Sequence, residues 1–207
     1  MEIYLPTEHV YTLTTQINID TARDRIEQKK MNLVAGMVGA LLSRPKPEEL
    51  QLITTENRLE PFWLVAASSK TKYDRAAIYT VTTGWKEVKS VTVLGQDLPA
   101  LPQPKGDPTF RLTAIEHCVQ ELHTQQTFDG ITGTKVDFQK YANFARTEIS
   151  DISTFNPERI LLIPPQVRAT AVVRQVTTEV VRPVKNAQAV HEERVDIETV
   201  DLNFRPV

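Results

Sequence analysis

The chain contains very little cysteine and no excess of charge of one sign. Among its 207 residues Cys118 is the only cysteine, which excludes an intrachain disulfide and is compatible with a reducing compartment. The formal net charge is -2 and the isoelectric point is about 6.1. The chain as a whole therefore has no electrostatic attraction for nucleic acid or for an anionic membrane.

The sequence also lacks an apolar run long enough to span a membrane. As a helix, the apolar residues 31–42 would reach about 18 Å, whereas the hydrocarbon core of a bilayer is roughly 30 Å thick. The first residues, MEIYLPTEHV, lack the basic and apolar regions of a secretory signal. We therefore expect a cytoplasmic protein without a membrane span.

No catalytic or metal-binding motif is complete. The densest set of potential metal ligands is Glu116, His117, Cys118, Glu121 and His123. Known zinc signatures require spacings such as H-E-x-x-H or paired C-x-x-C, and neither occurs here. An ordinary polar surface segment is the favoured interpretation of this set.

Two other patterns fall short of a known site. The segment GITGTK at residues 130–135 has two residues between its glycines, whereas a phosphate-binding Walker loop needs four. No G-x-S-x-G sequence surrounds Ser68 or Ser69. We therefore expect no cofactor, no metal and no catalytic residue, although an enzyme of unknown class stays open.

The sequence does contain a strand-rich segment between residues 45 and 83. Its alternating β-branched and apolar residues predict three consecutive antiparallel strands, at residues 50–55, 62–67 and 77–82. Pro61 is expected to interrupt the first pair of strands, and the polar residues 68–74 are expected to form a turn or an exposed strand end. The middle strand, which contains Trp63, is apolar on both faces and is expected to be interior.

A helix is predicted over residues 21–42, where Ile26, Leu33, Met37 and Leu41 recur at helical spacing. The favoured interpretation is a core helix packed on the sheet. Insertion of its apolar end into a partner or a membrane surface is the alternative.

The second half of the chain gives weaker patterns. Residues 109–126 leave helix and strand both open, with the helix slightly favoured. A turn is predicted at residues 128–133 and a helix with an aromatic face at residues 138–152. The valine-rich residues 169–182 favour a helix, and residues 193–207 alternate as a strand does.

The proline-rich residues 99–108 form the best linker in the sequence, because proline disfavours regular strand pairing. We therefore predict an N-terminal lobe at residues 1–98 and a C-terminal lobe at residues 109–207, which is expected to continue beyond the chain end if the chain is a fragment. The predicted fold class is α+β, a mainly antiparallel sheet with packed helices in two lobes.

Several short segments carry a resemblance. They are PKPEEL at residues 45–50, EPFW at residues 60–63, YDR at residues 73–75, YTV at residues 79–81 and the final VDLNFRPV. This succession resembles uncharacterised prokaryotic proteins with a Pro-Phe-Trp strand after a Pro-x-Pro-Glu-Glu turn. The resemblance supports β structure and implies no known activity.

With no active-site motif, the sequence favours a non-catalytic interaction or assembly module, in a homo-oligomer or a larger complex. The residues predicted to contact the protein partner are Leu33, Met37, Leu41, Leu202 and Phe204. The alternative is nucleic-acid binding through lysines and aromatic rings around the central sheet. The residues of that patch are Lys70, Lys72, Tyr73, Arg75, Trp85, Lys86 and Lys89.

Overall fold

The structure, a computed structural model, describes residues 2–15, 18–37, 50, 54, 56–155 and 160–207. It is mostly β, with 51% strand and 15% helix. The expected α+β fold with packed helices is therefore wrong, and a large mixed sheet takes its place. Among the described residues, no helix has the length and apolar character needed to cross a bilayer.

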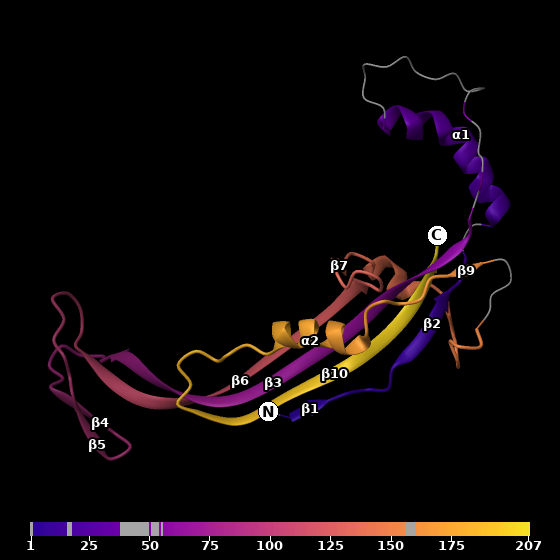
Figure 1. Ribbon diagram of the computed structural model, residues 1–207. Helices are drawn as coiled ribbons and strands as arrows, with labels where there is room; N and C mark the ends of the chain where they lie inside the picture. Colours follow the sequence, from indigo (N-terminus) through magenta and orange to yellow (C-terminus); the bar gives the residue numbers. More distant parts are fainter. Residues whose placement is uncertain (1, 16–17, 38–49, 51–53, 55, 156–159) are drawn as a thin grey trace. The chain divides into compact units, whose positions relative to one another are not determined.

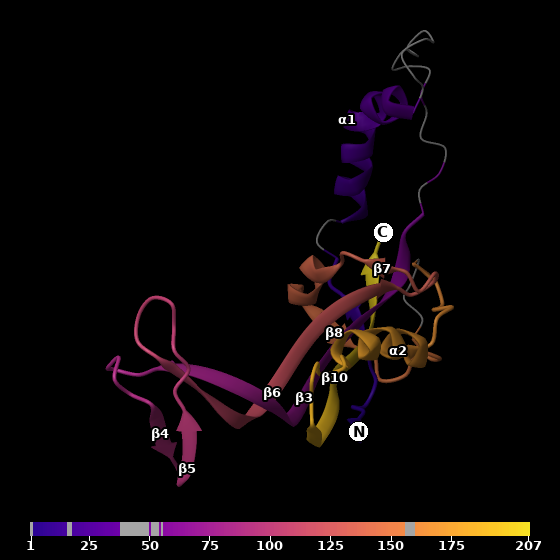
Figure 2. The same cartoon turned by 90° about the vertical axis from the view of Figure 1, so that its left-hand side faces the viewer.

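Three long strands dominate the sheet: β3 (Arg58–Thr82), β6 (Thr109–Asp129) and β10 (Ala189–Pro206). They lie side by side in Figures 1 and 2. The remaining strands of this sheet are β1 (Glu2–Tyr4), β2 (His9–Leu13), β7 (Lys135–Val136), β8 (Arg146–Glu148) and β9 (Leu161–Leu162). A separate hairpin consists of β4 (Ser90–Val93) and β5 (Gln96–Pro99).

The strand order is β7-β6-β3-β10-β2-β8, with β1 paired to β10 and β9 paired to β3. The strands β1 and β2 run parallel to β10, whereas β8 runs antiparallel to β2. Thr83 N donates to Pro108 O and Gly130 N donates to Pro61 O, so β3 and β6 form one long antiparallel pair.

The chain forms two compact units. Unit 1 comprises Met1–Tyr4, Ala67–Thr124 and Thr177–Asp196, and unit 2 comprises Leu5–Ala66, Gln125–Val176 and Ile197–Val207. The expected linker, residues 99–108, lies within unit 1: Pro99 is the last residue of β5, and residues 100–108 connect β5 to β6.

The strand β3 replaces the interrupted hairpin that the sequence predicts. Pro61 has no N–H to offer Gly130 O, but that oxygen accepts hydrogen bonds from Gln166 N and Val167 N instead. The missing donor therefore leaves no carbonyl unsatisfied, and the strand continues through the proline. The prediction that Trp63 is interior is confirmed, since its side chain is only 4% exposed.

The polar residues 68–74 continue the same strand and form no turn. Within unit 1, Ser69 Oγ donates to Val180 O of the helix α2 (Ala169–Val180) over 2.7 Å. Lys70 pairs with Glu121 of β6, and Asp74 lies within hydrogen-bond distance of His191 of β10. The partners of Ser69, Lys70 and Asp74 come from α2, β6 and β10, so these contacts stabilise the strand here.

Two further predictions in the second half are confirmed: α2 is a helix, and β10 is a strand. In unit 2, Val172 and Val176 of α2 are buried, and Trp63 Nε1 donates to Val167 O over 2.9 Å. The turn after β6 is also confirmed, because Asp129 Oδ1 accepts from Ile131 N and Thr132 N.

Two helix predictions are wrong. The favoured helix over residues 109–126 is the strand β6. The helix over residues 138–152 is a short 3₁₀ turn, η2 (Gln139–Asn143), followed by β8. Its aromatic residues do gather, because Phe62, Phe138 and Tyr141 pack with ring centroids 5.5 to 6.0 Å apart.

The first helix, α1, covers Ile19–Met37. Its described side chains, from Asp20 to Lys30, are mostly exposed, and Ile26 among them is exposed too. These side chains therefore do not form the expected core contact. The first predicted strand, at residues 50–55, and Leu41 lie outside the described residues apart from single positions.

Candidate functional site

The outer edge of β6 is the most distinctive surface of unit 1. Leu101 bridges Thr109 at one end of the strand, and β7 pairs with Thr127 and Phe128 at the other. Among the described residues, no strand pairs with the outer edge of β6 from Arg111 to Leu122. At roughly 3.4 Å per residue this edge is about 40 Å long.

The odd-numbered residues of β6 direct their backbone groups to this edge. Thr109 exchanges both backbone hydrogen bonds with Leu101 on the outer side, whereas Pro108 O accepts from β3 on the inner side. Backbone groups alternate between the two sides of a strand. The N–H and C=O groups at the free edge therefore belong to Arg111, Thr113, Ile115, His117, Val119 and Glu121.

The same residues also present their side chains to solvent. Along β6 the odd-numbered side chains from residue 111 to residue 125 are exposed, and the even-numbered ones between them are half-buried. Ile115 and Val119 are 58% and 57% exposed. The edge therefore combines unpaired strand backbone with two accessible apolar side chains.

Cross-strand contacts to β3 hold this part of β6 in place. Lys70 Nζ lies 2.7 Å from Glu121 Oε1, and Arg75 Nε donates to Glu116 Oε2 over 2.5 Å. Tyr79 also donates its hydroxyl to Glu116. The hydrogen bonds from Tyr79 and Arg75 lower the pKa of Glu116, so its carboxylate stays ionised.

A carboxylate between two histidines links the three long strands in unit 1. Asp74 Oδ1 lies 2.6 Å from His117 Nδ1 of β6, and Asp74 Oδ2 lies 2.7 Å from His191 Nε2 of β10. Hydrogen bonds from His117 and His191 lower the pKa of Asp74. The cluster therefore fixes the middle of β6 to the centre of the sheet.

The potential metal ligands near Cys118 do not come together. His117, Glu121 and His123 belong to the exposed face of β6, whereas Glu116 and Cys118 belong to the opposite face. No group of three or more His, Cys, Asp or Glu side chains suited to a metal ion occurs in the part of the chain that the structure describes.

The residues predicted to contact a partner lie elsewhere. Leu202 and Phe204 are buried in β10, which lies between β3 and β2, so they are core residues. Leu33 and Met37 belong to α1, and Leu41 lies outside the described residues.

The residues of the predicted nucleic-acid patch all lie in unit 1, but they are divided. Lys70 and Lys72 alternate with Tyr73 and Arg75 along β3, so the two pairs face opposite sides of the sheet. Lys70, Lys72 and Arg75 are each ion-paired with a glutamate. Trp85 is 74% exposed in the loop before β4, where Lys86 and Lys89 are also exposed.

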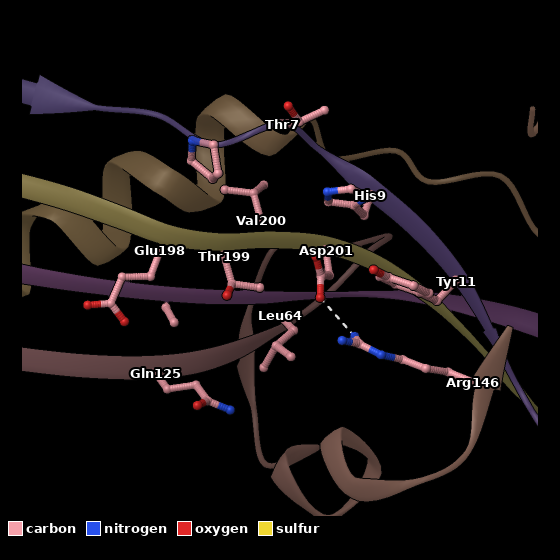
Figure 3. A pocket seen from close by; sticks show the side chains of 12 residues that line it. Thr7, His9, Tyr11, Leu64, Gln125, Arg146, Glu198, Thr199, Val200 and Asp201 are labelled. Carbon is pink, nitrogen blue, oxygen red and sulfur yellow. Dashed lines mark hydrogen bonds and ion pairs between the residues drawn. The ribbon is translucent and has the colours of Figure 1, made fainter. Parts of the chain in front are cut away.

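Unit 2 contains a pocket of about 300 Å³ on one face of the sheet (Figure 3). Leu64 and Ala66 of β3 contribute apolar surface to it. The polar residues around them are Thr7, His9, Tyr11, Gln125, Arg146, Glu198, Thr199 and Asp201.

One ion pair dominates this pocket. Arg146 Nη1 donates to Asp201 Oδ2 over 2.8 Å, and the guanidinium carbon lies 4.0 Å from the centroid of the Tyr11 ring. The Asp201 side chain is 5% exposed, so Arg146 compensates for its burial. The ion pair therefore gives the buried carboxylate a charged partner within the chain.

Sequence patterns did not predict the free edge of β6 or the pocket of unit 2. His9 belongs to no motif in the sequence, and its Nδ1 lies 2.8 Å from Glu148 Oε1. Arg146 and Asp201 are 55 residues apart in sequence, and no local motif connects them. The only signal for the edge of β6 was the absence of a proline or a glycine from Thr109 to Asp129.

In comparisons with known proteins, no family model, curated protein or solved structure matches the chain.

Proposed function

We propose that the chain is a non-catalytic interaction module that binds a protein partner by adding a strand to the outer edge of β6. The observation that carries this proposal is the edge from Arg111 to Leu122, which has no strand partner among the described residues. In such binding, backbone hydrogen bonds supply affinity and alternate side chains supply specificity.

The edge has the groups that this mode of binding needs. An incoming extended segment would meet the outward N–H and C=O groups of Thr113, Ile115, His117 and Val119. Its side chains would cover the exposed Ile115 and Val119. Burying this apolar surface and pairing the backbone groups both favour association.

The edge also lacks most features that prevent strand pairing. Proteins protect exposed edges with short strands, prolines, bulges or lysines. β6 is 21 residues long, and its outward residues from 111 to 121 include neither proline nor lysine. Arg111 and Glu121 are the charged residues at the two ends of this stretch, so the apolar centre is left accessible.

Nucleic-acid binding is the alternative and has less support. Lys70, Lys72 and Arg75 already have carboxylate partners, so binding phosphates would first break those ion pairs. Trp85 with Lys86 and Lys89 is the remaining exposed group. Binding of a single-stranded oligonucleotide that weakens with salt and with Trp85→Ala would favour this alternative.

The proposal includes a cytoplasmic location. The only cysteine of the chain, Cys118, allows no intrachain disulfide and is compatible with a reducing compartment.

Residue-by-residue amide hydrogen exchange tests strand addition. The full chain, at low concentration, is compared with and without a synthetic peptide of residues 110–123, which serves as a strand donor. We expect the outward amides of Thr113, Ile115, His117 and Val119 to exchange fast in the free chain. At ten times its Kd the peptide should slow them about tenfold, because only the bound fraction is protected.

A matched pair of variants controls for charge. Val119→Lys places a lysine on the edge, and Thr80→Lys places one at an exposed position of β3, one strand inward from that edge. Only Val119→Lys should abolish the protection by the peptide. Outward amides that are already slow at a concentration where the chain is monomeric, or unchanged by the peptide, would contradict strand addition.

A further inference from the structure

Four apolar residues at the free edge of β6 are placed symmetrically about His117. Leu112 and Leu122 lie five positions on either side of this residue, and Ile115 and Val119 lie two positions on either side. All four belong to unit 1 and to the edge that has no strand partner among the described residues. In an antiparallel pair of two identical strands, residues equally distant from the centre stand opposite each other.

The backbone restricts which residue can lie at the centre of such a pair, on the twofold axis between the two strands. An outward residue of one strand must face an outward residue of the other, so odd-numbered residues must pair with odd-numbered ones. The overlap is longest when the centre lies near the middle of Arg111–Leu122. Glu116 and His117 are the two candidates for that centre.

Pairing centred on His117 matches apolar residues on both faces. On the exposed face, Ile115 stands opposite Val119 of the second copy, and the symmetry repeats this contact. On the other face, Leu112 stands opposite Leu122 of the second copy, again twice. Apolar and β-branched cross-strand neighbours stabilise a sheet, so four favourable contacts arise from one register.

Pairing centred on Glu116 is much poorer. It places Glu116 directly opposite Glu116 of the second copy, and like charges in that position are destabilising. It also places Ile115 opposite His117 and Leu112 opposite Gln120. The two ion pairs that it offers, between Arg111 and Glu121, are exposed and contribute little.

The positions of the two glutamates are also compatible with the register centred on His117. Glu121 stands opposite Thr113 of the second copy, and Glu116 stands opposite Cys118, so no two carboxylates meet. The contacts that hold Glu116 and Glu121 to β3 stay in place, because Arg75 and Lys70 approach from the inner side.

We propose that the partner at this edge is a second copy of the same chain, paired antiparallel through β6 with the twofold axis at His117. This inference rests on the proposed function and specifies its partner. It makes the interface isologous, so the same edge serves both copies and the sheet continues from one copy into the other.

Disulfide trapping tests the register, with the native Cys118 as one half of the bridge. In the proposed register, residue 116 faces Cys118 of the second copy in a non-hydrogen-bonded pair, where the Cα atoms are about 4.5 Å apart. This separation lies within the range that a disulfide requires, roughly 4.4 to 6.8 Å. Glu116→Cys should therefore give a covalent dimer in oxidised glutathione, seen on a non-reducing gel. Peptide mapping should place its bridge between residues 116 and 118, because a bridge between the two copies of residue 116 would mean that the centre is Glu116.

Two other chains trap the neighbouring registers. Ala114→Cys can reach Cys118 of the second copy only when the centre is Glu116, and the wild-type Cys118 can reach its own equivalent only when the centre is Cys118. We expect Glu116→Cys to cross-link at least about tenfold faster than either. Because Glu116 also binds Arg75, the double variant His117→Cys with Cys118→Ser provides a second test, with one thiol at the proposed axis.

The remaining outcomes separate the two proposals. Analytical ultracentrifugation should show a dimer that Val119→Lys weakens about tenfold or more and Thr80→Lys does not. Suppose that the chain stays monomeric and nothing cross-links, while the peptide of residues 110–123 still protects the outward amides. Strand addition is then supported, and the proposal that the partner is a second copy is overturned. If the peptide also leaves those amides unchanged, both are overturned. Faster cross-linking of Ala114→Cys or of the wild type would overturn the register.

Discussion

Gly130 lies directly against Pro61 in unit 2. Gly130 N donates to Pro61 O over 2.9 Å, and a Cβ atom on Gly130 would come within 2.7 Å of Pro61 Cβ and of Pro61 O. Both contacts are with a rigid ring and with backbone, which cannot move aside easily. We expect Gly130→Ala to lower the free energy of unfolding by about 1–3 kcal/mol, because the added methyl group overpacks this contact.

Urea unfolding measures this effect, and Gly84 provides the control. No atom lies within 4 Å of the Cβ position at Gly84, so Gly84→Ala should leave the free energy of unfolding nearly unchanged. Equal stability of the two variants would mean that the close approach to Pro61 does not restrict residue 130.

The indole of Trp63 gives a second prediction. Trp63 Nε1 donates to Val167 O over 2.9 Å, and the ring is 4% exposed. Trp63→Phe keeps an aromatic ring but leaves Val167 O without this donor. We expect a loss of about 1–3 kcal/mol in the free energy of unfolding, because a carbonyl that loses its buried donor is costly.

Trp85 is the matched control for this substitution. It is 74% exposed, so Trp85→Phe should change the free energy of unfolding by less than about 0.5 kcal/mol. The result to look for in urea unfolding is a clear difference between the two variants. A Trp63→Phe chain as stable as the wild type would show that Val167 O finds another donor.

The extent of β3 shows where local sequence patterns fail. Pro61 and the polar residues 68–74 both predict breaks, and neither occurs. The reason is that their partners come from distant parts of the chain: Gln166 and Val167 bond the carbonyl opposite Pro61, and Val180 accepts from Ser69. A sequence window contains only one side of each of these interactions. The burial of Trp63, the helix α2 and the strand β10 were predictable, because the pattern of apolar residues along a segment is a local signal.

The edge of β6 could not have been predicted for a different reason. Leu112, Ile115, Val119 and Leu122 recur at a spacing that also fits a helix, and long-range pairing with β3 decides for the strand. An edge is moreover a property of strand order, which depends on which strands remain unpaired. The same four residues that predict a helix are those that match one another about His117.

The buried ion pair in the pocket of unit 2 gives a third prediction. Arg146→Met removes the charge that faces Asp201, whose side chain is 5% exposed. We expect a loss of about 1–3 kcal/mol in the free energy of unfolding, since Arg146 itself is partly accessible to water. Adding Asp201→Asn should recover part of this loss, because the uncompensated charge is then gone.

A double-mutant cycle measures this coupling. Its terms are the unfolding free energies of the wild type, Arg146→Met, Asp201→Asn and the double variant. Strictly additive losses would mean that the pair at 2.8 Å contributes nothing beyond its separate side chains.

Protonation of Asp74 gives the last prediction. Hydrogen bonds from His117 and His191 lower the pKa of Asp74 below that of an unfolded chain, about 3.9. Folding therefore favours the ionised carboxylate, so its contribution to stability is complete above the unfolded pKa and is lost as the pH falls through the lower, folded pKa. Thermal unfolding of the wild type and of Asp74→Asn should differ in melting temperature at pH 6, and the difference should shrink below about pH 4.

In a chain with His117→Gln and His191→Gln, Asp74→Asn should have a smaller effect at every pH, because the two donors that lower the pKa of Asp74 are missing. If the effect of Asp74→Asn were the same in both backgrounds, the histidines would not be the cause of the lowered pKa.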